Sequence, residues 1–328
     1  RCLSDWSSDV CSSDLQIVET PNGIKAKSFF NKYPLEYRKI IEESKEAGKY
    51  VPQTCSTLEE KVGRARTFFN YCLTKNYIKT NYLSDLEEYG RDTIQQFSLE
   101  EKERTIITSY QLNKMFLECD IFKIKDIYHN QPSIFLVPLI TLFTGTRLNE
   151  LCGLRKEDVK DENGIFYFSI RENTSRNIKS KKGNRKVPIH SFLIDELKIL
   201  DYVNKLSDNS LLFPDLEDKK HISNGYGASV SKVFNRLKIQ FLTEEDLELN
   251  KIDFHSLRTT FITRLHMGEV EEALINGLSG HKQNTMSYKR YITCELIRLQ
   301  KEIEKLYIED IMDNLKIVSQ RILDLKFY

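Results

Sequence analysis

Two arginines in the second half of the chain stand where they could hold a phosphate group. Arg147 follows Gly145 at the predicted start of a helix, with Glu150 three positions later. His255 and Arg258 are also three apart, which places both on one helix face. A guanidinium can donate paired hydrogen bonds to the non-bridging oxygens of a phosphodiester, and a histidine can add a donor or accept a proton near neutral pH. These residue types predict a site that neutralises and reacts with phosphate.

Candidate nucleophiles and a further acid lie closer to the C-terminus. His281 follows Gly280 at the end of a short apolar helix, and Tyr288 and Tyr291 share one face of the segment after it. A tyrosine hydroxyl can attack phosphorus and form a covalent bond, although its ordinary pKa of about 10 requires neighbouring cations. Taken singly, each candidate also has a structural explanation, as a surface ion pair, a helix cap, a turn or a half-buried tyrosine. Their combination and order favour the chemical interpretation.

The densest run of positive charge lies between these clusters, at 176–186. Six of its eleven residues are basic and none is acidic. One explanation is a solvated hairpin tip, and another is a loop that lays its side chains along the phosphates of DNA. The other clusters favour the second explanation. The DNA-binding candidates are Arg176, Lys181, Lys182, Arg185 and Lys186, and Lys179 is a candidate acid.

Composition limits what else the chain can be. Its 328 residues carry 49 Lys and Arg against 48 Asp and Glu, a net charge of +1, so a case for nucleic-acid binding rests on local charge. The longest apolar run, Ile134–Ile140, is far shorter than the roughly 20 residues of a membrane span, so we expect no membrane association. Seven scattered cysteines without a C-x-x-C pair argue against zinc and disulfides and favour the reducing cytoplasm. Because a G-x-x-x-x-G-K loop and a carboxylate cluster for Mg²⁺ are both missing, we expect no cofactor and no metal.

The chain divides into three predicted segments. Residues 1–15 contain two near-copies of a Cys-x-Ser-Asp motif and resemble a translated sequencing adapter, so we interpret them as non-native. Residues 16–105 have helical periodicity and end in a charge-dense stretch, 98–105, that we interpret as a linker. Residues 106–328 combine helical patterns with two strands, Gly164–Ile170 and Lys186–Ile189. Helices are predicted there from about Ser109, over Phe135–Phe143, Arg147–Leu154, Ile194–Leu206, Ala228–Phe241 and Phe254–His266, and from there to the end. The predicted fold class is mainly α with a small antiparallel β-sheet.

The order of these motifs resembles that of the tyrosine recombinase, or phage integrase, family. The sequence has G-x-R-x-x-E-L, a lysine in a basic hairpin, H-x-L-R, G-H and a final tyrosine, and the likeness extends over about residues 57–310. Leu139–Leu151 is similar to the helix that presents the family's first arginine, and Val187–His190 to the strand that closes its lysine hairpin. The resemblance implies that 16–105 is a helical core-binding domain, one half of a clamp around DNA, and that 106–328 is the catalytic domain.

The resemblance also implies a role for each candidate. Two arginines would hold the scissile phosphate, a lysine would protonate the leaving 5′ oxygen, and a tyrosine would attack phosphorus to leave a 3′-phosphotyrosine. The lysine is assigned to Lys179 with Lys181 as the alternative, and the nucleophile to Tyr291 with Tyr288 as the alternative. The residue after the second arginine is Thr259, where family members often have histidine. The implied catalytic set is Arg147, Lys179, His255, Arg258, His281 and Tyr291, supported by Glu150.

The function implied by the resemblance is site-specific DNA recombination, as the integrase or excisionase of a mobile element, without metal or ATP. The implied partners are double-stranded DNA attachment sites, further copies of the chain in a tetramer on DNA, and accessory DNA-bending proteins, in the cytoplasm and associated with the nucleoid. Two alternatives stay open: a type IB topoisomerase, which rejoins the same strand, and a non-catalytic DNA-binding regulator on the same fold. The tyrosine argues against the regulator, which has no need of it.

An apolar stripe follows the candidate nucleophile. Apolar residues step by four, three, four and three positions along the segment after about Leu306, as on one face of a helix. They are Ile311, Leu315, Val318, Ile322 and Leu325. This face could pack on its own domain or dock into a neighbouring protomer. Because C-terminal helices of the resembled family commonly do the latter, the segment is predicted to be an oligomerisation helix.

Overall fold

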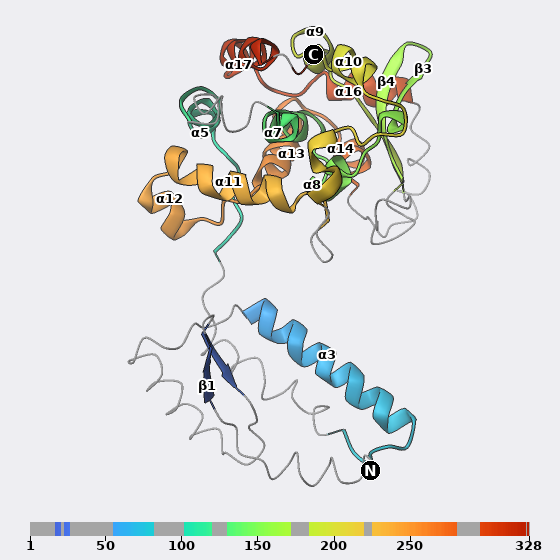
Figure 1. The fold of residues 1–328 in the computed structure, drawn as a ribbon, viewed down its shortest axis with the longest axis vertical. Helices are drawn as coiled ribbons and strands as arrows, with labels where there is room; N and C mark the ends of the chain where they lie inside the picture. Colours follow the sequence, from blue (N-terminus) through green and yellow to red (C-terminus); the bar gives the residue numbers. More distant parts are fainter. Residues whose placement is uncertain are drawn as a thin grey trace. The chain divides into compact units, whose positions relative to one another are not determined.

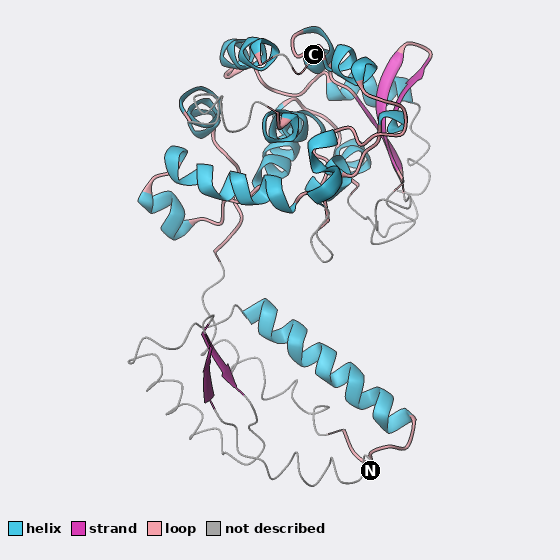
Figure 2. Ribbon diagram, in the orientation of Figure 1, coloured by secondary structure: helices cyan, strands magenta, loops and turns pink. Residues whose placement is uncertain are grey.

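The computed structural model describes residues 17–20, 23–26, 55–81, 102–119, 130–171, 184–219, 225–280, 296–325 and 327. The chain divides into two compact units, Arg1–Glu101 and Lys102–Tyr328 (Figure 1). Helices make up most of the described structure and strands form two small antiparallel sheets, which confirms the predicted fold class (Figure 2). None of the helices in these ranges has the length and apolar character needed to span a lipid bilayer.

The described part of the first unit is a β-hairpin and one long helix. Strands β1 (Ile17–Thr20) and β2 (Gly23–Ala26) pair antiparallel, so the prediction of helix throughout 16–105 is wrong here. The overlooked signal is the dipeptide Asn22-Gly23, which favours a tight hairpin turn. Helix α3 (Cys55–Thr74) agrees with the helical periodicity of the following segment.

The second unit is built around one buried helix, α7 (Pro132–Thr144). All its residues after Pro132 are buried, as expected for a helix that is apolar on every side, and α13 (His255–Met267) packs against it near the middle of the unit (Figure 1). The other helices among the described residues are α5 (Ser109–Asn113), the π-helical η1 (Lys114–Glu118), α8 (Leu148–Cys152), the 3-10 helices η3 (Lys156–Asp158) and η5 (Pro214–Lys219), α9 (Ser191–Asp195), α10 (Ile199–Lys205), α11 (Ala228–Phe241), α12 (Glu244–Leu249), α14 (Glu272–Ser279), α16 (Leu296–Ile303) and α17 (Met312–Asp324).

A three-stranded antiparallel sheet lies at one side of this unit (Figure 2). Strands β3 (Val159–Glu162), β4 (Ile165–Ile170) and β5 (Arg185–Pro188) follow one another in order, and Phe168 of β4 pairs with Val187 of β5. Two of the strands confirm the prediction. Strand β3 was missed because three of its four residues are charged and carry no alternating apolar pattern.

Two boundaries differ from the sequence prediction. The helix predicted over Ile194–Leu206 is two helices, α9 and α10, because Lys198 adopts a left-handed backbone conformation with φ of 52°. Residues 102–104, which the sequence placed in a linker, belong to the second unit and are bonded within it. The Lys251 amide donates to the carbonyl of Glu103 at 2.9 Å, and Arg104 pairs with Asp253 at 2.9 Å.

The apolar stripe near the C-terminus belongs to the core of its own unit. Ile311, Leu315, Val318 and Ile322 are each at most 2% exposed, and α17 packs against η1. Burying this face within the unit removes its apolar surface from water. The stripe therefore packs within its own unit, and the assignment of this segment to oligomerisation stays a prediction.

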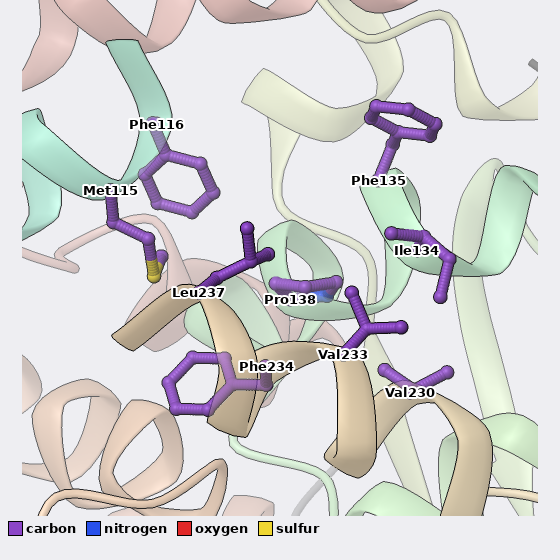
Figure 3. A pocket seen from close by; sticks show the side chains of 9 residues that line it. All are labelled: Met115, Phe116, Ile134, Phe135, Pro138, Val230, Val233, Phe234 and Leu237. Atoms are coloured by element: carbon purple, nitrogen blue, oxygen red, sulfur yellow. The ribbon is translucent and has the colours of Figure 1, made fainter. Parts of the chain in front are cut away.

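A small apolar gap remains in this core, between η1, α7 and α11 (Figure 3). Its volume is about 20 Å³, room for no more than a single water molecule, and every side chain around it is apolar. It is therefore a packing gap and not a ligand site. Its lining residues are Met115, Phe116, Ile134, Phe135, Pro138, Val230, Val233, Phe234 and Leu237.

Candidate active site

The first candidate arginine is held at the junction of α7 and α8. Helix α7 is capped by Gly145, which has a left-handed conformation (φ 59°) and whose amide donates to the Thr141 carbonyl at 2.8 Å. The Arg147 amide donates to Glu150 Oε2 at 3.1 Å, and its guanidinium Nη1 donates to Glu150 Oε1 at 2.9 Å. Arg147 Nη2 also donates to the Gly280 carbonyl at 3.3 Å. With 42% of its side chain exposed, the guanidinium is oriented by the protein and still reachable from solvent.

The second candidate arginine comes from α13. Arg258 is 1% exposed, and its Nη1 donates to the carbonyls of Ser279, at 2.6 Å, and of Gly145. Its Nε and Nη2 have no hydrogen-bond partner among the described residues. A buried donor without an acceptor lowers the stability of the folded protein by about 1–3 kcal/mol, and a charged donor lowers it further. These N–H groups are therefore well suited to bind an incoming anion.

Positive charge exceeds negative charge around these arginines. Burial, followed by the nearby cations Arg147 and Arg185, lowers the pKa of Arg258 to about 9. Burial would raise the pKa of Glu150, but its interactions with Arg185 and Arg147 outweigh burial and lower that pKa to about 2. Within the described residues, three guanidiniums are therefore grouped around one ionised carboxylate. This excess favours an anionic ligand and the still more anionic transition state of phosphoryl transfer.

The third of these guanidiniums belongs to Arg185, which the sequence analysis assigned to DNA binding. Its side chain is 8% exposed. Arg185 Nη2 donates to Glu150 Oε2 at 2.7 Å, and its Nε donates to the Leu278 carbonyl at 2.9 Å. The structure thus places Arg185 inside the site and not on an exposed surface, which corrects the expected orientation.

The next residue, Lys186, points outward. Its side chain is 46% exposed, its Nζ pairs with Glu162 at 2.5 Å, and the same atom lies 5.1 Å from the centre of the Tyr167 ring. The hydrogen bond from Lys186 to Glu162 raises the pKa of Lys186. Its assignment to DNA binding stays a prediction.

His255 begins α13, one turn before Arg258. Its amide donates to Asp253 Oδ1 at 2.9 Å. Burial, and then the cations Arg104 and Arg258, lower the pKa of the imidazole to about 4, although the Asp253 carboxylate acts in the opposite direction. His255 is therefore uncharged at neutral pH and can accept a proton or donate a hydrogen bond.

A cleft of about 330 Å³, with mostly polar residues around it, opens beside His255 and Arg258. The buried hydroxyl of Thr141, which also lines it, has no hydrogen-bond partner among the described residues. The cleft is large enough to admit a phosphate group. Its lining residues are Thr141, Thr146, Leu148, Ser231, Asn235, Asp253, Phe254, His255 and Arg258.

The structure brings together four of the predicted catalytic and supporting residues: Arg147, Glu150, His255 and Arg258. Arg185, which was predicted to bind DNA, lies in the same cluster. The remaining candidates lie outside the described residues, and their roles stay predictions. They are Lys179, His281, Tyr291 and its alternative Tyr288, and the basic residues Arg176, Lys181 and Lys182.

The end of α14 contributes to the site in a way that the sequence did not reveal. The backbone carbonyls of 278–280 each accept a hydrogen bond from a different one of the three arginines. Backbone acceptors leave no signature in residue type. Gly280, which ends α14 with a left-handed φ of 72°, is nevertheless a recognisable helix-stop signal.

The fold is similar to that of the Tn1549 transposon integrase, in a structure solved with a circular intermediate DNA. The two chains are 17% identical, with a TM-score of 0.50, and the likeness covers 92% of this chain and 92% of the other. It is the fold that this likeness shows.

Two proteins are similar in sequence. Tyrosine recombinase XerH of Campylobacter jejuni is 26% identical over 196 residues, which are 58% of this chain and 50% of the relative. Tyrosine recombinase XerA of Thermococcus kodakarensis is 30% identical over 182 residues, which are 54% and 57% of the two chains. The chain thus spans about half the length of the curated relatives it matches.

The sequence pattern of the phage integrase family matches residues 107–295, more than half of the chain. The matched segment contains all the arginines and histidines of the candidate site. The chain belongs to the phage integrase family, which confirms the resemblance of its motifs.

Proposed function

We propose that this protein is a tyrosine site-specific recombinase that cuts and rejoins double-stranded DNA at attachment sites. The observation that carries the proposal is the pair of guanidiniums, Arg147 and Arg258, bonded to adjacent carbonyls at one helix end, with two nitrogens of Arg258 still without acceptors among the described residues. Such a pair is suited to both non-bridging oxygens of a phosphodiester and to the extra charge of its transition state. Membership of the family supports the same chemistry.

In the proposed reaction the hydroxyl of Tyr291 attacks the scissile phosphorus. Its proton passes to a base, a role proposed for His255, which is uncharged at neutral pH, and His281 donates to a phosphate oxygen. The bond from phosphorus to the 5′ oxygen breaks, and Lys179 gives that oxygen a proton. A 3′-phosphotyrosine and a free 5′-hydroxyl result. Attack by a 5′-hydroxyl of another strand reverses these steps and restores the diester, so the proposed route needs no metal and no ATP.

The proposed biological role is integration or excision of a mobile element. Exchange between two duplexes cuts four strands, so the proposal includes about four copies of the chain on DNA. It also includes accessory DNA-bending proteins and a cytoplasmic location in association with the nucleoid. The apolar face of α17 is buried in its own unit and gives no support to this assembly.

Covalent capture tests the proposal even though the target site is not defined beforehand. The protein is incubated with sheared genomic DNA of its source organism, the mixture is denatured, and the DNA that stays linked to protein is sequenced. A nicked duplex carrying the captured site then traps the intermediate on a denaturing gel. We expect a covalent band with the parent protein, and none with Tyr291→Phe, which loses one hydroxyl and retains DNA binding.

Other outcomes identify the alternatives. Specific DNA binding with no covalent band would indicate the non-catalytic regulator. Relaxation of a supercoiled plasmid without exchange between two sites would indicate the topoisomerase.

A further inference from the structure

Three arginines from three separate elements converge on the C-terminal end of α14. They come from β5, from the residue before α8 and from α13. The three hydrogen bonds are Arg185 Nε to the Leu278 carbonyl at 2.9 Å, Arg258 Nη1 to the Ser279 carbonyl at 2.6 Å and Arg147 Nη2 to the Gly280 carbonyl at 3.3 Å. The last carbonyls of a helix carry partial negative charge, so they attract cations. One helix end thus arranges three guanidiniums side by side.

Glu150 joins two of these guanidiniums through one carboxylate. Its Oε2 accepts from Arg185 Nη2 at 2.7 Å and from the Arg147 amide at 3.1 Å, while its Oε1 accepts from Arg147 Nη1 at 2.9 Å. Because the carboxylate is shared, a displacement of Arg185 would displace Glu150 and, with it, Arg147.

Arg185 differs from Arg147 in how much of it the solvent can reach. Its side chain is 8% exposed, against 42% for Arg147. A Cβ added at Gly280 would lie 2.9 Å from Arg185 Nη1, so the guanidinium fills the space that a side chain would take there. Arg185 therefore packs between the carboxylate and the turn, with its donors directed at protein.

We infer that Arg185 is a positioning residue for strand cleavage, which sets the placement of Arg147 and of the α14 turn and does not contact DNA. The inference rests on the proposed function and adds a residue to its machinery. A lysine could keep the charge at this position, but it could not span both Glu150 and the Leu278 carbonyl with fixed geometry.

Single-turnover cleavage of the nicked duplex tests the inference with Arg185→Gln. We expect the cleavage rate at saturating DNA to fall about 100-fold, the scale of misplacing a reacting group, while the Kd for DNA changes less than about threefold. The matched control is Arg171→Gln, which removes a different arginine ion pair, with Glu157 and Asp158, beside the same sheet. It should cleave within about threefold of the parent.

A double-mutant cycle with Glu150→Gln provides a measurement that general destabilisation would not reproduce. If Arg185 acts through Glu150, the double variant should cleave no more than about threefold slower than the slower single variant, because both changes interrupt one connection. Arg185→Lys should recover part of the rate. If Arg185→Gln has no cooperative thermal unfolding transition, Arg185→Lys is assessed by the same rate and Kd criteria.

The inference would be overturned if Arg185→Gln cleaved DNA within about threefold of the parent rate, or if the rate losses of the two single variants multiplied in the double variant. It would also be overturned if Arg185→Gln bound DNA more weakly and the slope of log affinity against log salt concentration fell by about one, because that change marks a lost phosphate contact. A parent protein that forms no covalent adduct would instead refute the proposed function, and the inference with it.

Discussion

The two ends of α13 each bury an arginine, but with opposite patterns of partners. Arg264, near the C-terminal end, is 4% exposed and donates to both carboxylate oxygens of Asp310, at 2.8 and 3.1 Å. It also donates to the Tyr307 carbonyl at 2.7 Å and to the Ser109 hydroxyl at 3.1 Å. Arg258, near the other end, is 1% exposed and uses only Nη1, with carbonyls as its acceptors, within the described residues.

This difference separates an arginine that stabilises the fold from one that is ready to bind a ligand. A buried cation with a bidentate carboxylate and further acceptors has its charge and donors satisfied, so it ties segments together. Around Arg258 the nearest charges include the cations Arg147 and Arg185, and two nitrogens have no acceptor among the described residues. Such an arrangement lowers the stability of the ligand-free protein and favours the binding of an anion.

The largest effect should come from removing the unsatisfied arginine. We expect Arg258→Ala to lower the cleavage rate by about 10³-fold or more, on the scale of losing a preorganised donor to the transition state. Removal of the incompletely neutralised cation offsets part of the cost of the cavity that the substitution leaves, so the free energy of unfolding should change little. Single-turnover adduct formation and urea unfolding measure the two quantities. A strong loss of stability with retained cleavage would make Arg258 a structural residue.

The same substitution at the other end of α13 should have the reverse effect. Arg264→Ala leaves Asp310 without its cation and frees the segment around Tyr307, so the free energy of unfolding should fall by about 3 kcal/mol. Cleavage per folded molecule should stay within about threefold of the parent. A large rate loss at unchanged stability would show that both ends of the helix serve the reaction.

A comparable loss of stability is expected at Gly145, whose carbonyl accepts a hydrogen bond from Arg258. A Cβ at Gly145 would lie 2.3 Å from Phe261 Cδ1, and φ is 59°. Strain and overpacking together should make Gly145→Ala less stable by about 2–4 kcal/mol. The control is Gly164→Ala, where φ is 80° but no atom lies within 4 Å, so only the strain applies. If Gly145→Ala and Gly164→Ala lost the same free energy of unfolding in urea, the contact with Phe261 would add nothing to the backbone strain.

The smallest effect concerns pH and is again confined to the Arg258 end of α13. The folded protein holds the pKa of His255 near 4, below its ordinary 6.5. Between these values the unfolded chain binds a proton that the folded chain does not, so stability falls as pH drops from about 6.5 to 4. For a half-buried imidazole we expect the free energy of unfolding to fall by roughly 2 kcal/mol over this range. In His255→Asn the difference in unfolding free energy between pH 7 and pH 4.5 should shrink accordingly. An unchanged difference would place the responsible group elsewhere.

Sequence patterns predicted those elements whose periodicity is strong and local. The apolar helix α7, the amphipathic α11, the helix α13 and the strands β4 and β5 all lie at or near their predicted positions. The break between α9 and α10 depends on the backbone of one residue, Lys198, whose type does not favour it. The stripe of α17 was recognised, but periodicity cannot tell which surface a face covers.

The residue types of the site could be predicted from the sequence, but the hydrogen-bond partners of these residues could be predicted only in part. Arg147, His255 and Arg258 were identified because their motifs occur in a recognisable order. Arg264 belongs to the same helix as Arg258, and nothing in the local sequence separates their roles, since Asp310 is 46 positions from one and the Ser279 carbonyl 21 from the other. Arg185 was assigned to DNA binding because it belongs to the basic run 176–186, and a run of like charges does not show which of its side chains face the protein interior.

The most direct test of the account is to identify the residue that carries the DNA after covalent capture. Trypsin separates the two candidate tyrosines, because cleavage after Lys282, Lys289, Arg290 and Arg298 leaves Tyr288 in peptide 283–289 and Tyr291 in peptide 291–298. After nuclease digestion of the adduct, mass spectrometry should find the nucleotide on peptide 291–298 as a phosphotyrosine ester. A nucleotide on peptide 283–289 would move the nucleophile to Tyr288. No modified peptide, from a protein that binds the captured site, would contradict the account of a phosphotyrosine recombinase.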